Sequence, residues 1–232
     1  MREPSNDNRT GLLSEDIDLQ DASWLRNEMD KRNIIALSPD DCEQNRLEIL
    51  KNHDPAKDLW IFGYGSLMGD AGADVAETLP ALVTGWRRSF CIDMLFGRGS
   101  PRKPGLMMAL DKGGECRGIA HRILAKDIES QTKILWQNEM ALRTYRPAWI
   151  EVTIDNKPQE ALAFVIDQET HLYAGSLSPA IQARRIATAE GPLGLNRDDL
   201  YNCAAELKRR EISDSYIEDL TARTRALAQD KD

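Results

Sequence analysis

The order of strand-like and helix-like patterns is the feature that most constrains how this 232-residue chain folds. Apolar runs of strand length occupy its middle, at residues 59–62, 82–92, 106–110, 116–124, 148–154 and 161–166. One helical pattern interrupts them at 127–142, and three others close the chain at 178–189, 198–210 and 215–228. Strands that precede most helices, instead of alternating with them, favour an α+β fold with an antiparallel or mixed sheet that can curl into a small barrel.

Glycine and proline mark the connections expected between the strands. Gly85 predicts a bend or bulge inside the strand at 82–92. Asp111-Lys-Gly-Gly114 predicts a hairpin turn between the next two strands. Asp155-Asn-Lys-Pro158 predicts a second hairpin between the last two.

Polar residues at two helix starts are expected to cap them. Asp40 stands at the start of a helical pattern at 40–51, and Asn196 or Asp198 precedes the pattern at 198–210. A side-chain oxygen at such a position accepts a hydrogen bond from a free N–H group of the first turn.

Composition argues against several classes of protein. The formal net charge is −8, whereas a nucleic-acid surface needs clustered lysine and arginine to replace counterions. No apolar stretch approaches the roughly 20 residues of a membrane span. The chain also lacks GxGxxG and P-loop sequences, which disfavours the nucleotide-binding folds. The sequence therefore predicts neither a nucleic-acid partner nor a membrane partner.

The cysteines and histidines predict no metal site. Four cysteines, at 42, 91, 116 and 203, are widely separated, and three histidines, at 53, 121 and 171, lack the spacing of metal ligands. The first residues are polar and contain no apolar core of a signal peptide. Scattered thiols in such a chain predict a cytoplasmic protein with reduced cysteines.

The first quarter of the chain differs from the rest. Residues 1–57 carry 8 lysines and arginines against 13 aspartates and glutamates, and apolar residues are sparse. Helices are expected at 21–31 and 40–51, before the His53-Asp-Pro55 breaker. We interpret 1–57 as an extension of short helices or partly mobile chain, and 58–232 as the main domain. A solvated tail and a partner-binding segment both fit its composition.

An apolar strand at 59–62 breaks abruptly into Gly63-Tyr-Gly-Ser66. Glycines flanking an aromatic residue permit a tight turn whose successive N–H groups converge on one point. Such a concavity binds carboxylate or phosphate groups. The alternative is a plain glycine turn between a strand and a loop.

A local surplus of positive charge follows between residues 84 and 105. Five cationic side chains stand there against the single acid Asp93: Arg87, Arg88, Arg98, Arg102 and Lys103. In an acidic protein this surplus fits an anionic ligand, and it equally fits a solvated loop.

A carboxylate stands among apolar residues on the helix at 127–142. At about 100° per residue, Glu139 falls about 20° from Ile128, inside the stripe that Leu135 continues. Burial disfavours a charged carboxylate and raises its pKa, and a carboxyl group that titrates near neutrality suits general acid–base catalysis. The alternative is a structural glutamate paired with an arginine or with backbone donors.

Several of these motifs together resemble one protein family. The segments occur in the family's order: Phe62-Gly-Tyr-Gly-Ser-Leu-Met68, Pro104-Gly-Leu106, Trp136-Gln-Asn-Glu-Met140, Tyr173-Ala-Gly-Ser176 and Gly191-Pro-Leu-Gly-Leu-Asn196. They resemble the ChaC-like proteins, which are glutathione-specific γ-glutamylcyclotransferases. The resemblance covers about residues 58–225 and leaves the extension unaccounted for.

The resemblance implies a small twisted barrel surrounded by helices, and an enzyme that converts glutathione to 5-oxoproline and Cys-Gly without a metal or organic cofactor. It implies that Glu139 is the catalytic acid–base and that a turn holds the γ-glutamyl end of the substrate, formed by Ile61, Phe62, Gly63, Tyr64, Gly65, Ser66 and Leu67. Arg98 or Arg102 is the candidate to bind the glycine carboxylate of glutathione, and Tyr145 and Tyr173 are candidate pocket walls. Asn138 departs from the family, which often has arginine there.

Two other functions remain open at this point. The first is a cyclotransferase for other γ-glutamyl peptides or amines, and the second is a binding protein that has kept the pocket and lost turnover. The presence of Glu139 favours an enzyme.

Overall fold

The computed structural model describes residues 37–69, 72–140 and 143–229. Its elements follow in the order α2 (Pro39–Leu50), β1 (Leu59–Gly63), η1 (Ser66–Met68), β2 (Glu77–Met94), β3 (Gly105–Ile123), η2 (Ala125–Asp127), α3 (Ile128–Glu139), β4 (Tyr145–Ile154), β5 (Lys157–Ile166), α4 (Pro179–Thr188), β6 (Glu190–Gly191), β7 (Gly194–Leu195), α5 (Asn196–Arg209) and α6 (Ser215–Gln229). The helix predicted at 21–31 lies outside the described residues.

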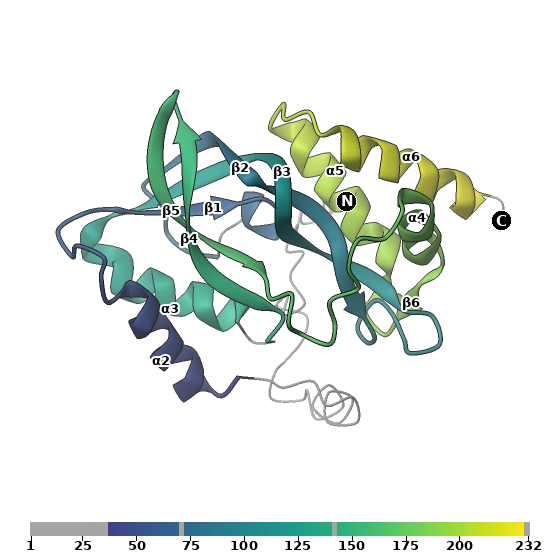
Figure 1. Cartoon of the computed structure of the whole chain (residues 1–232), viewed down its shortest axis with the longest axis horizontal. Helices are drawn as coiled ribbons and strands as arrows, with labels where there is room; N and C mark the ends of the chain where they lie inside the picture. The colour runs from purple at the N-terminus through teal and green to yellow at the C-terminus, as the bar shows by residue number, and fades with distance from the viewer. Residues whose placement is uncertain (1–36, 70–71, 141–142, 230–232) are drawn as a thin grey trace, which may run out of the picture.

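Five strands close into a barrel in the order β1-β3-β2-β4-β5, and β5 also pairs with β3 (Figure 1). Most neighbours are antiparallel, while β5 runs parallel to β1 at Leu162 and to β3 at Val165. The predicted α+β fold with a mixed sheet curled into a barrel is therefore confirmed. Closure leaves the apolar faces of the strands packed against one another inside, with Phe62 and Leu110 fully buried.

The strands β2 and β3 form one long antiparallel pair that bends in the middle. The register shifts between Thr84 and Trp86, and Gly85 there has φ +81°. The predicted bulge at Gly85 is confirmed. The predicted hairpin at Asp111–Gly114 is wrong, because β3 runs without a break from Gly105 to Ile123. Gly113 and Gly114, with φ +97° and +71°, lie opposite the bulge at Gly85. These two glycines let β3 bend together with β2.

The second predicted hairpin is confirmed. The strands β4 and β5 are antiparallel: Tyr145 pairs with Ile166 at one end, and Ile154 pairs with Lys157 at the other. Two residues remain for the loop. Asp155 and Asn156 have φ +49° and +60°, the left-handed conformation that a tight hairpin of this length requires at both positions.

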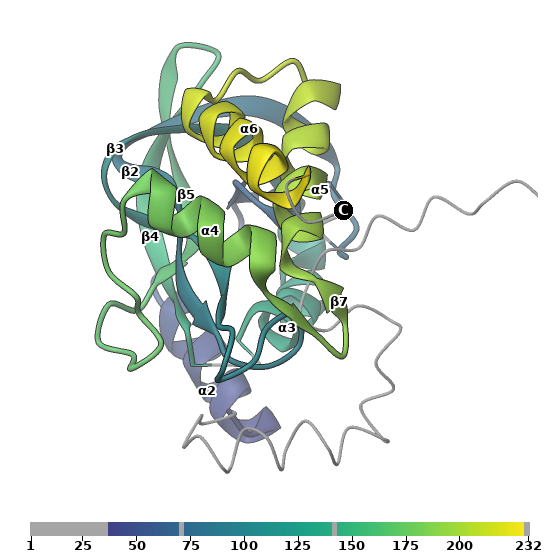
Figure 2. The ribbon, with the colours of Figure 1, turned by 90° about the vertical axis from the view of Figure 1, so that its right-hand side faces the viewer.

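The helices gather in two groups around the barrel. Helices α4, α5 and α6 pack together against β2 and β3, while α2 and α3 lie side by side in another place (Figures 1 and 2). The apolar cluster beneath α4–α6 contains Phe90 and Leu106 from the barrel. The cluster beneath α2 and α3 contains Ile61 and Leu162. Each group thus covers its own part of the barrel wall.

Both predicted helix caps are wrong. The hydroxyl of Ser38, not Asp40, accepts a hydrogen bond from the Asp41 N–H at 3.1 Å, with Pro39 opening the first turn of α2. At α5 the N-cap is Leu195, which supplies no side-chain cap. The Asn196 side chain instead bonds the N–H and C=O of Leu106 on β3, at 2.7 and 2.9 Å. The local sequence pattern predicts Asn196 as a cap, but its side chain binds the distant strand β3 instead.

A substitution at Gly118 on β3 tests how closely the barrel interior is packed. A Cβ atom there would lie 2.3 Å from the Gly63 carbonyl oxygen and 2.9 Å from the Phe62 ring. We expect Gly118→Ala to lower the free energy of unfolding by about 2 kcal/mol or more, because neither neighbour is free to retreat. Urea denaturation measures the change. Lys112→Ala, exposed on the same strand, is the control and should change it by less than about 0.5 kcal/mol; equal effects would contradict the packing argument.

Candidate active site

The predicted glycine turn begins where β1 leaves the barrel. The chain folds back after Gly63, so that a Cβ on this residue would lie 2.8 Å from the carbonyl oxygen of Leu67. Only glycine accepts that approach without a shift of the backbone. Gly65 and Ser66 then lie partly exposed at the start of η1. The turn is therefore a tight structure at the mouth of a strand.

Two buried side chains hold the carbonyl groups of this turn. The Arg88 Nε donates to the Tyr64 carbonyl oxygen at 2.6 Å, and the His121 Nε2 donates to that of Leu67 at 2.7 Å. The His121 Nδ1 lies 2.9 Å from the hydroxyl oxygen of Thr78, which donates to it when the imidazole is neutral. Arg88 and His121 are both at most 3 % exposed. Two hydrogen bonds from buried side chains thus fix the backbone of the turn.

The N–H groups of the turn are not used in the same way. Within the part of the chain that the structure describes, those of Gly65, Ser66 and Leu67 donate no hydrogen bond. The carbonyl groups of the turn are hydrogen-bonded, whereas these three N–H groups are not. The free N–H groups therefore carry partial positive charge that a ligand can neutralise. Such an arrangement binds carboxylates and stabilises oxyanions.

Glu139 is the last residue of α3 and is half-buried. Its carboxyl group makes no hydrogen bond or ion pair with any described residue, so the predicted alternative of a paired structural glutamate finds no partner there. Burial alone raises the pKa of Glu139 to about 7. A desolvated carboxyl group without a partner at pH 7 is divided between its acid and base forms, as proton transfer requires.

Two tyrosines, the buried Tyr64 and the partly buried Tyr145, share the surroundings of Glu139. The Tyr64 hydroxyl donates to the Phe164 carbonyl oxygen and the Tyr145 hydroxyl donates to that of Met108, both at 2.7 Å. Burial first, and the charge of Glu139 in addition, raise the pKa of both phenols. Both rings are therefore neutral, fixed by the backbone and close to the carboxyl group. The structure brings Tyr64, Tyr145 and Glu139 together.

The other predicted site residues lie in different settings. Ile61 and Phe62 are fully buried on β1, Phe62 inside the barrel and Ile61 beneath α2 and α3, so neither side chain is exposed to a ligand. Arg98 already pairs with Asp198 at 3.4 Å and with Asp199 at 3.1 Å. Asn138, where the family often has arginine, is exposed on α3.

Tyr173 lies in a separate hydrogen-bond network. Its hydroxyl donates to the buried Asp111 carboxylate at 3.2 Å, and Gln168 and Arg87 contact the same carboxylate. Burial first, and the Asp111 carboxylate next, raise the pKa of Tyr173. Tyr173 packs against the same apolar cluster as Tyr145, and no hydrogen bond joins it to Glu139 among the described residues.

Sequence reasoning missed Asp199, at the first turn of α5. Burial raises its pKa to about 7, although Arg98 opposes the shift, and its charge also raises the pKa of Tyr145. The sequence also did not predict that Arg88 and His121 support the glycine turn. The only sequence signals were a charged residue inside an apolar strand in the case of Arg88 and a lone histidine in that of His121.

Comparison with known proteins decides the family. The family model for "ChaC-like protein" matches residues 59–227, which is well over half of the chain. The chain belongs to the ChaC-like family.

Named relatives agree with this membership. The chain is 34% identical over 170 residues to the glutathione-specific γ-glutamylcyclotransferase of Escherichia coli (strain K12), covering 73% of this chain and 74% of that one. It is 26% identical to the enzyme of that name from Schizosaccharomyces pombe, covering 78% and 98%. A crystal structure of a γ-glutamyl cyclotransferase specific to glutathione from yeast superposes with a TM-score of 0.64 at 16% identity, covering 74% of this chain and all of that chain, which confirms the fold.

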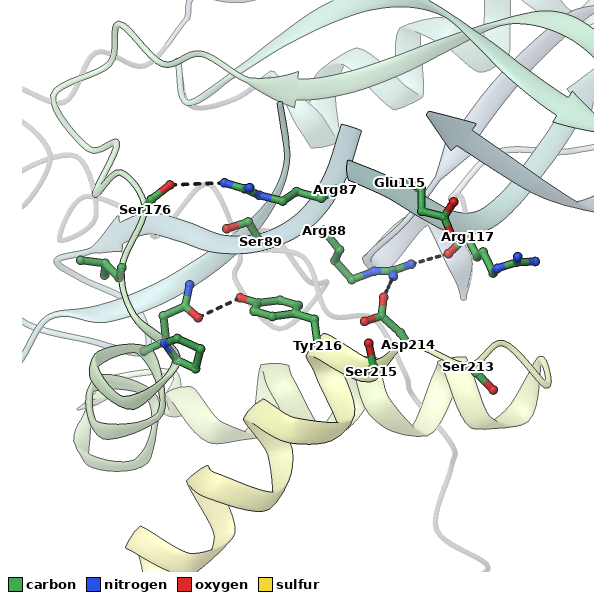
Figure 3. Close-up of a pocket in the computed structure, with 13 residues that line it drawn as sticks. Arg87, Arg88, Ser89, Glu115, Arg117, Ser176, Ser213, Asp214, Ser215 and Tyr216 are labelled. Atoms are coloured by element: carbon green, nitrogen blue, oxygen red, sulfur yellow. Dashed lines mark hydrogen bonds and ion pairs between the residues drawn. The ribbon is translucent and has the colours of Figure 1, made fainter. Parts of the chain in front are cut away.

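This ChaC-like barrel also carries a cleft outside the Glu139 region. A cavity of about 460 Å³ lies between β2, β3 and the start of α6 (Figure 3). Arg88 lines it and pairs there with Asp214, whose carboxylate accepts the Ile217 N–H at the start of α6. Because Arg88 also holds the Tyr64 carbonyl, one buried arginine joins the glycine turn to α6.

Two classes of site find no support in the described residues. No group of three or more potential metal ligands gathers in them. None of the helices described is long and apolar enough to cross a membrane.

Glu139→Gln tests the cost of burying this carboxyl group. Its pKa of about 7 in the folded protein exceeds the ordinary value of 4.5, so the wild type loses stability as the pH rises from about 4.5 through about 7. Glutamine lacks this charge. We expect the stability of the variant relative to the wild type to increase by about 1–3 kcal/mol between pH 4 and pH 8.

Urea unfolding of both proteins at pH 4, 6 and 8 measures this difference. Asp199 titrates in both proteins, so its contribution cancels. A difference that stays constant across this pH range would show that Glu139 is as solvated in the folded state as in the unfolded one.

Proposed function

We propose that this protein is a cytoplasmic glutathione-specific γ-glutamylcyclotransferase that converts glutathione to 5-oxoproline and Cys-Gly, with Glu139 as general acid and base. The observation that carries the proposal is the half-buried Glu139 carboxyl group, unpaired among the described residues, beside Tyr64 of the glycine turn. The names of the relatives support glutathione as the substrate.

The reaction needs little more than a correct substrate conformation. The α-amine of the γ-glutamyl group attacks its own side-chain carbonyl carbon, which forms the ring C–N bond. The bond from that carbon to the cysteine nitrogen then breaks. Since nucleophile and electrophile belong to one molecule, the protein's main task is to hold the near-attack conformer.

Proton transfer is the remaining task, and one carboxyl group can perform it. The attacking nitrogen must lose two protons, one before it attacks as a neutral amine and one as the ring C–N bond forms. Ionised Glu139 accepts one of them, and the other passes to solvent. The departing cysteine nitrogen must gain a proton, and the now protonated Glu139 donates it. A pKa of about 7 keeps both forms of Glu139 accessible at neutral pH. The cycle ends with Glu139 as it began, and it uses no cofactor.

The glycine turn supplies the complementary charge. Its N–H groups from Tyr64 to Leu67 hold the α-carboxylate of the substrate or stabilise the oxyanion that develops on the γ-carbonyl oxygen. The rings of Tyr64 and Tyr145 form the fixed walls of the pocket. Arg98 meets the glycine carboxylate only if it shares or leaves its pairs with Asp198 and Asp199. Tyr173, which packs against the same apolar cluster as Tyr145, remains a predicted wall of the pocket.

The proposal assigns the reaction to residues 58–232 and treats 1–57 as an extension. The family model, which begins at residue 59, supports this division. The barrel and the helices that carry the proposed site all lie C-terminal to it.

Incubation with millimolar glutathione tests the reaction and the residue together. We expect 5-oxoproline and Cys-Gly in equal amounts from the wild type, detected by mass spectrometry. Glu139→Gln keeps the shape and cannot carry the proton, so we expect its rate to fall by about 10²–10⁴-fold.

Glu160→Gln is the matched control, because Glu160 is an exposed carboxylate on β5. It should leave the rate unchanged. Product from Glu139→Gln at the wild-type rate would keep the reaction and refute the assignment of Glu139. Absence of product from the folded wild type would refute the proposed reaction.

A comparison of substrates tests the specificity for glutathione. We expect kcat/KM for glutathione to exceed that for γ-Glu-Ala, because γ-Glu-Ala lacks the glycine carboxylate and the thiol that a dedicated pocket recognises. Steady-state kinetics of both substrates at one pH provide the ratio. A higher kcat/KM for γ-Glu-Ala would contradict glutathione specificity and favour a cyclotransferase for other γ-glutamyl compounds.

A further inference from the structure

Helix α2 lies outside the family match and still packs on the helix that carries Glu139. It spans Pro39–Leu50, whereas the matched region begins at residue 59. It lies along α3 (Figure 1), and its Cys42 joins the same apolar cluster as Leu135, Trp136 and Met140 of that region. A helix predicted as part of a solvated or partner-binding extension is thus docked beside the proposed catalytic residue.

A buried arginine of α2 makes the central polar contact. Arg46 is 1 % exposed, and its guanidinium donates to the Thr132 hydroxyl of α3 at 3.0 Å. It also pairs with Glu129 of α3 at 3.1 Å and with Glu43 of its own helix at 2.7 Å. A rigid fork of donors that joins two helices fixes their relative position, whereas an exposed ion pair would not.

A second contact from α2 reaches the turn of α3 that ends in Glu139. The Asn45 side-chain oxygen accepts a hydrogen bond from the Trp136 indole N–H at 2.8 Å. Trp136 is 1 % exposed and packs edge-on against Phe164 of β5, with ring centres 5.2 Å apart. The Phe164 carbonyl in turn holds the Tyr64 hydroxyl. Trp136 therefore lies between α2 and the barrel wall that borders the proposed site.

The helix α2 is also anchored to the barrel itself. The Trp149 indole N–H of β4 donates to the Ile49 carbonyl of α2 at 3.2 Å. His53, just after α2, stacks on the same Trp149 ring at 5.8 Å. Contacts with both α3 and β4 make α2 a bridge between the two elements.

We propose that α2 is a brace for catalysis, in which Arg46 and Asn45 are positioning residues that hold the end of α3 so that Glu139 faces the glycine turn. The proposal rests on the proposed function, since it assigns Glu139 the proton transfer. Glu139 is the last residue of α3, so the packing of this helix sets the position from which its side chain extends. A displacement of about 1 Å is enough to cost about 10²-fold in rate.

The test uses substitutions in α2 of the full chain. Arg46→Met keeps the linear side chain and removes the donors, and Asn45→Leu removes the acceptor for Trp136. We expect kcat for glutathione to fall by about 10- to 100-fold in both, with KM changed by less than about threefold. We also expect the acid limb of the pH–rate profile to move to lower pH, because water then reaches Glu139 and its pKa returns towards its ordinary value.

Two matched variants separate positioning from a general loss of structure. Asn45→Asp keeps an acceptor for Trp136 and should retain kcat within about twofold. Lys51→Met changes an exposed residue at the end of α2 that pairs only with Glu48 among the described residues, and it should behave as wild type. If folded Arg46→Met and Asn45→Leu match these controls in kcat and pH profile, the brace proposal is wrong.

Hydrogen exchange of the α3 amides gives a readout that does not need glutathione. We expect residues 128–139 to exchange faster in Arg46→Met than in Lys51→Met, with the barrel strands unchanged. If the wild type does not turn over glutathione, the proposed function fails, and this exchange measurement still decides whether α2 holds α3. Equal exchange in the two variants would overturn the brace.

Discussion

Desolvation of one carboxyl group is the interaction on which the proposed site depends. An ionised carboxylate loses more hydration energy on burial than the neutral acid does, so burial without a partner stores a free-energy cost in the folded protein. Glu139 carries this cost, because no described residue donates to it. Placing a charge-bearing group in this state requires that its surroundings resist rearrangement towards it. The remaining structure around Glu139 meets that requirement.

Rigid supports surround the site on several sides. Arg88 and His121 hold the carbonyl groups of the glycine turn, and the Tyr64 and Tyr145 hydroxyls are fixed by backbone oxygens. Each of these side chains uses its hydrogen-bonding capacity on a backbone carbonyl oxygen. They leave the N–H groups of the turn and the Glu139 carboxyl group for a substrate. Preorganisation of this kind lowers the reorganisation needed in the transition state.

Local patterns predicted the parts of the structure that local chemistry determines. The strand that ends in Gly63, the bulge at Gly85 and the tight hairpin at Asp155 each follow from residues within a few positions. The burial of Glu139 followed from helical periodicity in the same way. Glu139 was the residue that broke the apolar pattern, and such breaks are expected at functional sites.

Distant partners explain the predictions that failed. Gly113 and Gly114 suit a hairpin turn and a bend equally well, and the long partner strand β2 decides in favour of the bend. Asn196 suits a helix cap, but Leu106 of β3 takes its side chain. Arg46 follows the polar pattern of an exposed helix, and only the presence of α3 buries it. None of these partners lies near enough in the sequence to be read from it.

The ionisation of Glu139 in the folded protein tests this account most directly. Carbon-13 labelling of the glutamate side chains, with the Glu139 signal assigned from its loss in Glu139→Gln, allows an NMR titration of its carboxyl carbon from pH 4 to pH 9. The account predicts a midpoint near pH 7, as expected for a pKa of about 7. A midpoint near the ordinary value of 4.5 would show that the group is solvated and would contradict the proposed role in proton transfer.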